Sequence, residues 1–248
     1  TERGRLTVEE LHGIATDGVC HLAVTYPPSG IASGERSRLR VDVTDAGQAL
    51  LTTSGPVRLH RTAGPVSTVE RQLTVSNSAA LEWLPRESVV GSRTDAQVNT
   101  RVILEERARL LGWEIASLGR AHDGSPVDDG RLQQRLEVRR AGEALVNERV
   151  IIDGGSIRTS TGETGGTAFA TLVAAGPDGI AETVAESLLR SLTRSPFPGS
   201  VWHVSGALVV RIPAATAAQA LEDLEGAWRR LRPLVVGREA GSLAWAWS

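Results

Sequence analysis

The stretch Leu39-Arg-Val-Asp-Val-Thr-Asp-Ala-Gly-Gln-Ala-Leu-Leu51 predicts a strand, a tight turn and a second strand. Apolar and polar residues alternate along its first half, as at Val41 and Val43, which is the period that turns one face of a strand toward a core. The run Thr-Asp-Ala-Gly that follows is typical of a turn. This unit indicates a β-rich fold.

The same unit recurs along the chain at intervals of about 30 residues, a period common among stacked supersecondary units. Further copies occupy residues 73–81, 102–111 and 136–145. A hairpin of this size cannot bury its own apolar face, so we expect the copies to stack. A meander in a β-sandwich would produce hairpins of the same size, and the residues alone leave that alternative open.

The residue pattern of the chain changes after residue 152. Residues 37–152 keep the strand-like alternation, whereas residues 156–166 are rich in Ser, Thr and Gly and predict a flexible loop. Helical spacing predicts helices over 180–192 and 214–234, with a strand over 207–212 between them. No linker separates the parts, so we predict a mainly β fold in one elongated domain, 1–248, with β-rich stacked hairpins over 37–152 and a mixed part with two helices over 153–248.

Composition excludes several classes of protein. The 248-residue chain has a formal net charge of -2 and no lysine, and its arginines are interleaved with acids, so we expect no nucleic-acid partner. With Cys20 as its one cysteine, it cannot form an intramolecular disulfide. It has neither an apolar run long enough to span a bilayer nor a signal-peptide pattern, which predicts a cytoplasmic protein with no membrane partner.

The sequence shows no catalytic constellation. The Gly-x-Ser-x-Gly motif of many hydrolases is absent and the histidines are scattered, so we expect no enzyme and no catalytic residue. Cys20 and His21 are the only weak candidates for a metal site. Adjacent residues on a strand point to opposite faces, and stable zinc sites need three or four ligands, so we predict no tight metal site.

Five acidic residues follow apolar strand segments: Glu35, Glu82, Glu87, Glu114 and Glu148. Carboxylates near a β core are costly unless they are paired, solvated or placed along a water-filled passage. One interpretation is ion pairing with neighbours such as Arg86 and Arg149. The other is a hydrated conduit for a divalent cation, because spaced carboxylates and water would let the ion pass where a Cys or His cluster would hold it.

Three segments carry a resemblance to a known family: Pro27-Pro-Ser-Gly-Ile-Ala-Ser-Gly-Glu35, Ala80-Leu-Glu-Trp-Leu-Pro-Arg-Glu-Ser-Val-Val90 and Leu110-Leu-Gly-Trp-Glu-Ile-Ala-Ser-Leu-Gly-Arg120. In order and spacing they resemble the UreD (UreH) family of urease accessory proteins, whose members typically read PPGGIVGGD, then LEWLPQE, then a Trp-acid pair followed by LGR. The match runs from Gly4 to Trp247. This resemblance favours stacked, β-helix-like sheets over a sandwich.

The resemblance implies a non-enzymatic scaffold that binds UreF, UreG and apo-urease and assists nickel delivery to the urease active site, through an internal water-filled passage. It implies transient Ni2+ and no tightly bound cofactor. The same five acids are the passage candidates, with Glu35, Glu114 and Glu148 standing where the family's motifs have acids. The motif residues expected to be structural are Pro27, Pro28, Gly30, Gly34, Trp83, Pro85, Trp113, Gly119 and Arg120.

The chain also departs from the family pattern. Tyr26 replaces a common His and Ser33 a Gly, while Leu59-His60 stands for Phe-Tyr. The family usually has a further strand pair ahead of Gly4, so the chain is expected to be short at its amino end. The competing function is a β-rich module that binds carbohydrate or peptide, with an exposed groove formed by tryptophans: Trp83, Trp113, Trp202, Trp245 and Trp247.

Overall fold

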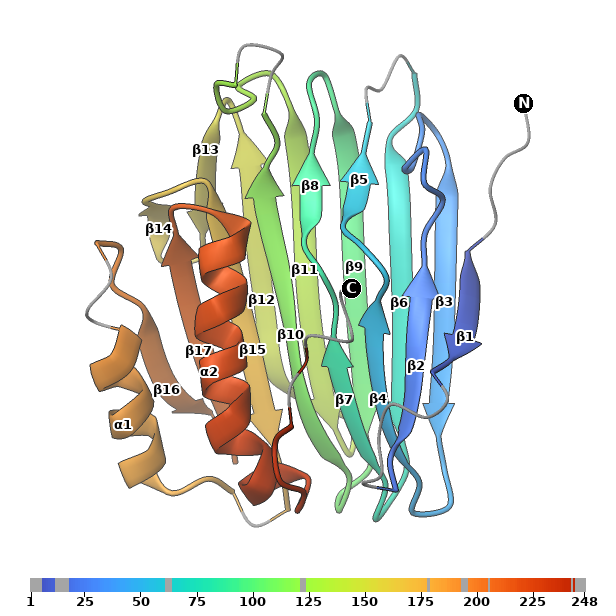
Figure 1. The fold of residues 1–248 in the computed structure, drawn as a ribbon, viewed down its shortest axis with the longest axis vertical. Coiled ribbons are helices and arrows are strands. Elements are labelled where there is room, and N and C mark those ends of the chain that lie inside the picture. Colours follow the sequence, from blue (N-terminus) through green and yellow to red (C-terminus); the bar gives the residue numbers. More distant parts are fainter. Residues whose placement is uncertain are drawn as a thin grey trace.

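Two β-sheets lie face to face, and two helices stand on the outer side of one of them (Figure 1). The computed structural model describes residues 6–11, 18–60, 64–120, 124–177, 179–192, 196–204, 206–241 and 243. Sheet A contains β1 (Thr7–Glu10), β2 (Cys20–Thr25), β4 (Gln48–Thr53), β5 (Val57–Leu59), β7 (Ala80–Leu84), β8 (Ser88–Val90), β10 (Arg109–Leu118), β15 (Ala168–Ala175), β16 (Ser200–Val204) and β17 (Ala207–Ala214). Sheet B contains β3 (Arg36–Val43), β6 (Ser67–Val75), β9 (Asp95–Leu104), β11 (Arg131–Arg140), β12 (Glu143–Asp153), β13 (Ser156–Thr159) and β14 (Gly162–Thr164).

The chain winds between the two sheets as a β-solenoid. Strands β2, β4, β7 and β10 are parallel neighbours in sheet A, and β3, β6, β9 and β11 are parallel neighbours in sheet B. Each coil therefore contributes a strand to each sheet and stacks on the coil before it. The stacked, β-helix-like sheets predicted from the sequence are confirmed.

The two strands within a repeat are arranged differently from the prediction. In the first three repeats the two connected strands lie in different sheets and pair with the next coil, so the predicted hairpins are wrong there. Only the fourth repeat, β11 and β12, is an antiparallel hairpin. The first turn places Asp45 and Ala46 at φ 54° and 59°, a left-handed conformation that redirects the chain into the other sheet.

The central strands of sheet A are buried on both faces. Its inner face packs against alternate residues of sheet B such as Leu73, Val102 and Val138, all at most 1% exposed. Its outer face packs against α2 (Ala217–Val235), whose Leu224 and Trp228 are equally buried. This explains why β10 and β15 are almost continuously buried.

The predicted helices are confirmed as α1 (Glu182–Leu192) and α2, and the strand between them as β17. Helix α2 begins after Thr216, whose side chain accepts a hydrogen bond from the Gln219 N–H, a standard N-cap. No helix in the described ranges is long and apolar enough to cross a membrane.

The flexible loop predicted over residues 156–166 is wrong. Strands β13 and β14 form an antiparallel hairpin there and extend sheet B beyond β12. The β-branched threonines suit strands, and Gly162, the first residue of β14, adopts φ 120° directly after the turn at residues 160 and 161. Composition alone could not distinguish this short edge hairpin from a loop.

Gly119 lies where the chain leaves β10, and its N–H donates to the Val90 carbonyl oxygen at 2.8 Å. A Cβ at this position would lie 2.6 Å from that same oxygen. We expect Gly119→Ala to lower the free energy of unfolding by roughly 1–3 kcal/mol, because the two segments must separate. Urea denaturation measures this. Gly55→Ala is the control, since its Cβ meets nothing within 4 Å, and an equal loss in both variants would contradict the steric argument.

Candidate functional site

The apolar layer between the sheets is interrupted by a buried ion pair. Arg71 projects inward from β6 and Glu114 inward from β10, with Arg71 Nη1 2.9 Å from Glu114 Oε2 and side-chain exposures of 0% and 3%. On β10 the alternation of side chains turns Trp113 toward α2 and Glu114 toward sheet B. The pair therefore joins the two sheets through the core.

Glu114 is the centre of a hydrogen-bonded cluster. Its oxygens accept from Trp83 Nε1 at 2.9 Å, Thr100 Oγ1 at 2.6 Å and Gln134 Nε2 at 3.4 Å. Arg71 Nε in turn donates to the Tyr26 hydroxyl at 3.0 Å. Burial alone would lower the pKa of Arg71, but the Glu114 carboxylate and Tyr26 raise it above its ordinary value, so the guanidinium keeps its charge.

A second buried pair lies toward the other end of the inner layer. Arg211 on β17 donates from Nε to Glu148 Oε2 on β12 at 2.7 Å, with side-chain exposures of 13% and 3%. The Arg211 guanidinium also lies 4.1 Å from the centroid of the Trp202 ring, a cation–π contact. Like the first pair, this one connects sheet A to sheet B.

Strand register places both pairs in one line, which we call the inner polar row. In sheet A, Glu114 is opposite Thr171, and Thr171 is opposite Arg211. In sheet B, Arg71, Thr100, Leu136 and Glu148 are successive neighbours. Since adjacent strands lie ~4.8 Å apart, Glu114 and Arg211 are separated by about 10 Å along the stacking direction.

Several atoms of the inner polar row have unused hydrogen-bonding capacity. Of the six buried side-chain atoms that have no partner among the described residues, three belong to this row and a fourth to Gln134, which bonds to Glu114: Arg71 Nη2, Glu148 Oε1, Thr171 Oγ1 and Gln134 Oε1. Buried polar atoms of this kind usually bind ordered water. We therefore expect ordered water to bind at these atoms, in the layer between the two sheets.

The Arg211 end of the row opens to the surface. Arg211 lines a cavity of about 270 Å³, together with Glu163 on β14 and Phe197 before β16. Glu148 does not line this cavity, but it is hydrogen-bonded to Arg211, which does.

The other predicted acids lie elsewhere. Glu82 neighbours Trp83 on β7 and so faces α2, where Arg232 Nε lies 3.0 Å and Trp228 Nε1 2.7 Å from its Oε1. Glu87 bonds to Arg86 at 3.2 Å, and Glu35 accepts the Ala32 N–H at 3.0 Å. The structure brings together Glu114 and Glu148 in one row and leaves the other three outside it.

Ion pairing of the acids is observed, with partners that differ in part from those predicted. Glu87 pairs with Arg86 as expected. Pairing with Arg149 is wrong, because Arg149 is adjacent to Glu148 on β12, points to the opposite face and donates to Gln133. The partners that sequence reasoning missed are Arg71, Arg211 and Arg232. A signal existed for Arg71, since it occupies an apolar position in the alternating strand β6.

The motif residues mostly serve packing and turns. Trp113 Nε1 donates to the Pro85 carbonyl at 2.8 Å. Gly30 has φ +73°, and a Cβ there would lie 2.6 Å from the Arg58 carbonyl. Arg120 Nη1 donates to the Gly124 carbonyl at 2.7 Å. The remaining motif positions are the buried Pro27, the exposed Pro28, and Gly34 at φ +69°.

The exposed tryptophan groove of the alternative function does not form from its first two members. Trp83 and Trp113 are each 1% exposed, and they bond to Glu114 and to Pro85 rather than to solvent. Trp202 is half-buried against Arg211. Trp245 and Trp247 lie outside the described residues.

Cys20 and His21 point to opposite faces of β2, as predicted, with Cys20 exposed and His21 buried. Within the part of the chain that the structure describes, no three His, Cys, Asp or Glu side chains gather in a way that could hold a metal ion.

Comparison with known proteins assigns the chain to a family. The family model described as UreD urease accessory protein matches residues 3–246. Urease accessory protein UreD 2 of Pseudomonas syringae pv. tomato is 37% identical over 225 residues, covering 90% of this chain and 79% of that protein. The UreD of Janthinobacterium sp. (strain Marseille) is 32% identical over 251 residues, covering 97% and 83%. With a family match over nearly its whole length and relatives at this identity, the chain belongs to the UreD family of urease accessory proteins.

Proposed function

We propose that this chain is a cytoplasmic scaffold that binds UreF, UreG and apo-urease, and that Ni2+ travels along its inner polar row on the way to the urease active site. Membership of the UreD family gives the coarser role, that of a non-catalytic accessory protein in urease maturation and nickel insertion. The observation that carries the finer proposal is the alignment of Glu114, Glu148 and the unpartnered polar atoms in one buried line.

The donor set of the inner polar row suits an ion in transit. Carboxylate and water oxygens bind Ni2+ more weakly than a cluster of thiolates or imidazoles would, so the ion is passed on rather than retained. Glu114 and Glu148 stand on opposite sheets, about 10 Å apart along the row by strand spacing. Bound water at Thr171 and Gln134 would bridge this interval.

Each carboxylate of the row is neutralised by an arginine, which sets a condition for passage. Arg71 contacts both oxygens of Glu114, and Arg211 contacts Oε2 of Glu148 while Oε1 stays unpartnered. A divalent cation can therefore approach Glu148 Oε1 without displacing Arg211, whereas at Glu114 the guanidinium must first give up an oxygen. The proposed passage includes Glu114 and Glu148 and not Glu35, Glu82 or Glu87.

The test is co-expression of the chain with UreF, UreG and apo-urease, followed by pull-down and a nickel-dependent urease activation assay. Glu148→Ala is expected to form the complex and to reduce activation about tenfold, the scale seen when a group that supports a metal is removed. Glu87→Gln is the matched control, because it alters an acid paired with arginine outside the inner polar row. It should activate urease like the wild type.

The outcomes separate the two parts of the proposal. Complex formation with unchanged activation in Glu148→Ala would retain the scaffold and reject Glu148 as a passage residue. Failure of the wild type to bind any of the three proteins would reject the scaffold itself. Equal losses in Glu148→Ala and Glu87→Gln would point to general instability rather than to a passage.

A further inference from the structure

The outer face of sheet B carries an excess of arginine. The outward positions of its strands from the β3 edge to β11 include Arg38 and Arg40 on β3, Arg101 on β9 and Arg135 on β11, with side-chain exposures of 67%, 72%, 57% and 48%. The chain as a whole has a formal net charge of -2, so this concentration of positive charge is local. Both described helices pack against strands of sheet A, which leaves this face of sheet B uncovered by a helix.

The carboxylates on this face are shared among several arginines. Glu137 lies within 3.1 Å of both Arg101 and Arg139 and 3.8 Å from Arg135. Glu70 is likewise 2.7 Å from Arg38 and 3.9 Å from Arg36. Arg40 pairs with Asp42 at 2.9 Å. Three carboxylates on this face, Asp42, Glu70 and Glu137, are thus shared by six arginines, so positive charge remains uncompensated: Arg36, Arg38, Arg40, Arg101, Arg135 and Arg139.

The pKa of Glu137 is lowered by the excess of positive charge on this face. A hydrogen bond from Arg139 lowers this pKa below the ordinary value, and Arg101 and Arg135 lower it further against the opposing effect of burial. The carboxylate therefore stays ionised to lower pH than usual, as expected beside an excess of cations.

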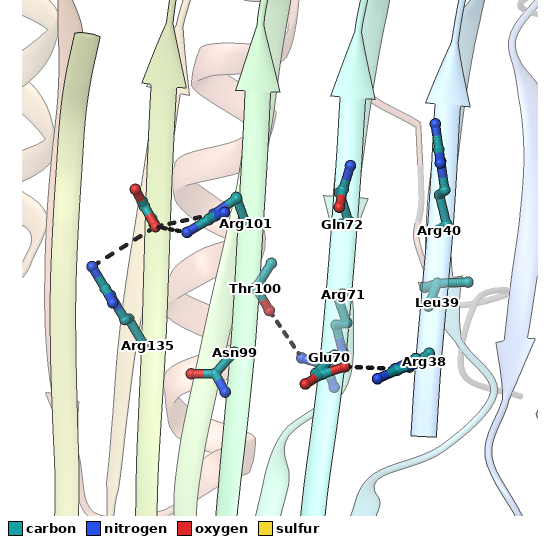
Figure 2. A pocket seen from close by; sticks show the side chains of 11 residues that line it. Arg38, Leu39, Arg40, Glu70, Arg71, Gln72, Asn99, Thr100, Arg101 and Arg135 are labelled. Atoms are coloured by element: carbon teal, nitrogen blue, oxygen red, sulfur yellow. Dashed lines mark hydrogen bonds and ion pairs between the residues drawn. The ribbon is translucent and has the colours of Figure 1, made fainter. Parts of the chain in front are cut away.

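A groove of about 610 Å³ runs over this face (Figure 2). Its floor includes the side chains of Gln72 and Asn99, with Arg38 and Arg40 forming one wall and Arg135 the other, and Arg101 stands on the same strand as Asn99. The two arginine walls stand on β3 and β11, three strand spacings or about 14 Å apart. A single phosphate ion cannot bridge such a distance, whereas a segment of protein chain can contact both walls.

We propose that this arginine groove is a docking surface for a carboxylate-rich segment of a protein partner in the urease maturation complex. The inference rests on the proposed scaffold function. The partner's carboxylates bind the guanidinium groups that Glu70 and Glu137 leave uncompensated, and its backbone or polar side chains bond to the amides of Gln72 and Asn99. Arginine is well suited to this role, since its planar group binds carboxylates with two parallel hydrogen bonds.

The test reverses charge on both walls of the groove with the double variant Arg38→Glu/Arg135→Glu. Association of immobilised full-length chain with UreF, UreG and apo-urease is followed separately at low and high salt. For one of these proteins the association rate should fall about tenfold or more and lose its salt dependence, because charges around an interface act mainly on the encounter rate. The control is Arg107→Glu, an exposed arginine in the turn between β9 and β10, which should leave the rate unchanged.

Thermal unfolding of both variants should match the wild type, because the altered side chains are exposed. Wild-type binding to a partner with unchanged rates in the double variant would overturn the docking surface and leave the scaffold intact. Wild-type binding to a DNA duplex that the double variant loses, with protein association unaffected, would also overturn it in favour of nucleic acid. If the wild type binds none of the three proteins, the scaffold fails first and the docking surface with it.

Discussion

Replacing Arg71 with methionine is expected to lower the free energy of unfolding by about 3–5 kcal/mol, the usual cost of leaving one partner of a buried ion pair alone. Glu114 is 3% exposed, and its nearest cation is Arg71 Nη1 at 2.9 Å. The remaining donors, Trp83, Thr100 and Gln134, are neutral and cannot balance its charge. Urea denaturation of the purified chain measures the change.

The double variant Arg71→Met/Glu114→Gln is the matched control. With both charges removed, most of the lost stability should return, because the cost arises from the unpaired carboxylate rather than from the missing guanidinium. Exposed Arg107→Met should stay within about 0.5 kcal/mol of the wild type. A loss below about 1 kcal/mol for Arg71→Met would contradict an ion pair shielded from bulk solvent.

Replacing Arg232 with methionine is expected to cost a similar amount, about 3–5 kcal/mol, on the other side of sheet A. Arg232 on α2 lies 3.0 Å from Glu82 on β7, and both side chains are at most 3% exposed between the helix and the sheet. This ion pair holds α2 on the sheet, together with the hydrogen bond that Trp228 donates to the same carboxylate. Loss of the cation therefore weakens the attachment of the whole helix, which circular dichroism during urea denaturation would detect.

The two variants should differ in their effect on urease activation. Per amount of complex formed, Arg232→Met should activate like the wild type, because Glu82 faces α2 and lies outside the inner polar row. Arg71→Met should alter activation per complex, because it changes the charge at Glu114. Identical behaviour of the two variants in this normalised assay would argue against the passage.

Local sequence predicted the secondary structure well where one face of an element is apolar. The alternation at Leu39, Val41 and Val43 marks a strand, and the helical spacing of Leu221, Leu224 and Trp228 marks a helix. The pairing of strands was less accessible. The same pattern of strand, turn and strand occurs whether the turn stays within one sheet or crosses to another. The residues near Asp45 therefore do not reveal that β3 and β4 lie in different sheets.

The site was only partly predictable for a related reason. Glu114 and Glu148 stand out as acids beside apolar runs, but Arg71 and Arg211 are 43 and 63 positions away from them in the chain. Strand periodicity shows that Glu82 and Trp83 face opposite ways. It cannot say which side is the inter-sheet layer, because β7 is buried on both faces.

The coil-on-coil pairing also bears on how the chain reaches its native state. Parallel neighbours such as Arg71 and Thr100 are 29 residues apart, so each coil must close a long loop before its strands gain a partner. The antiparallel pairs β11–β12 and β13–β14 need only short loops. We expect these hairpins, which begin at β11, the last parallel strand in the chain, to form early, so that the earlier coils then pair onto them in reverse order of synthesis. Until then the nascent amino-terminal strands keep unpaired edges, which makes newly made chain prone to aggregate.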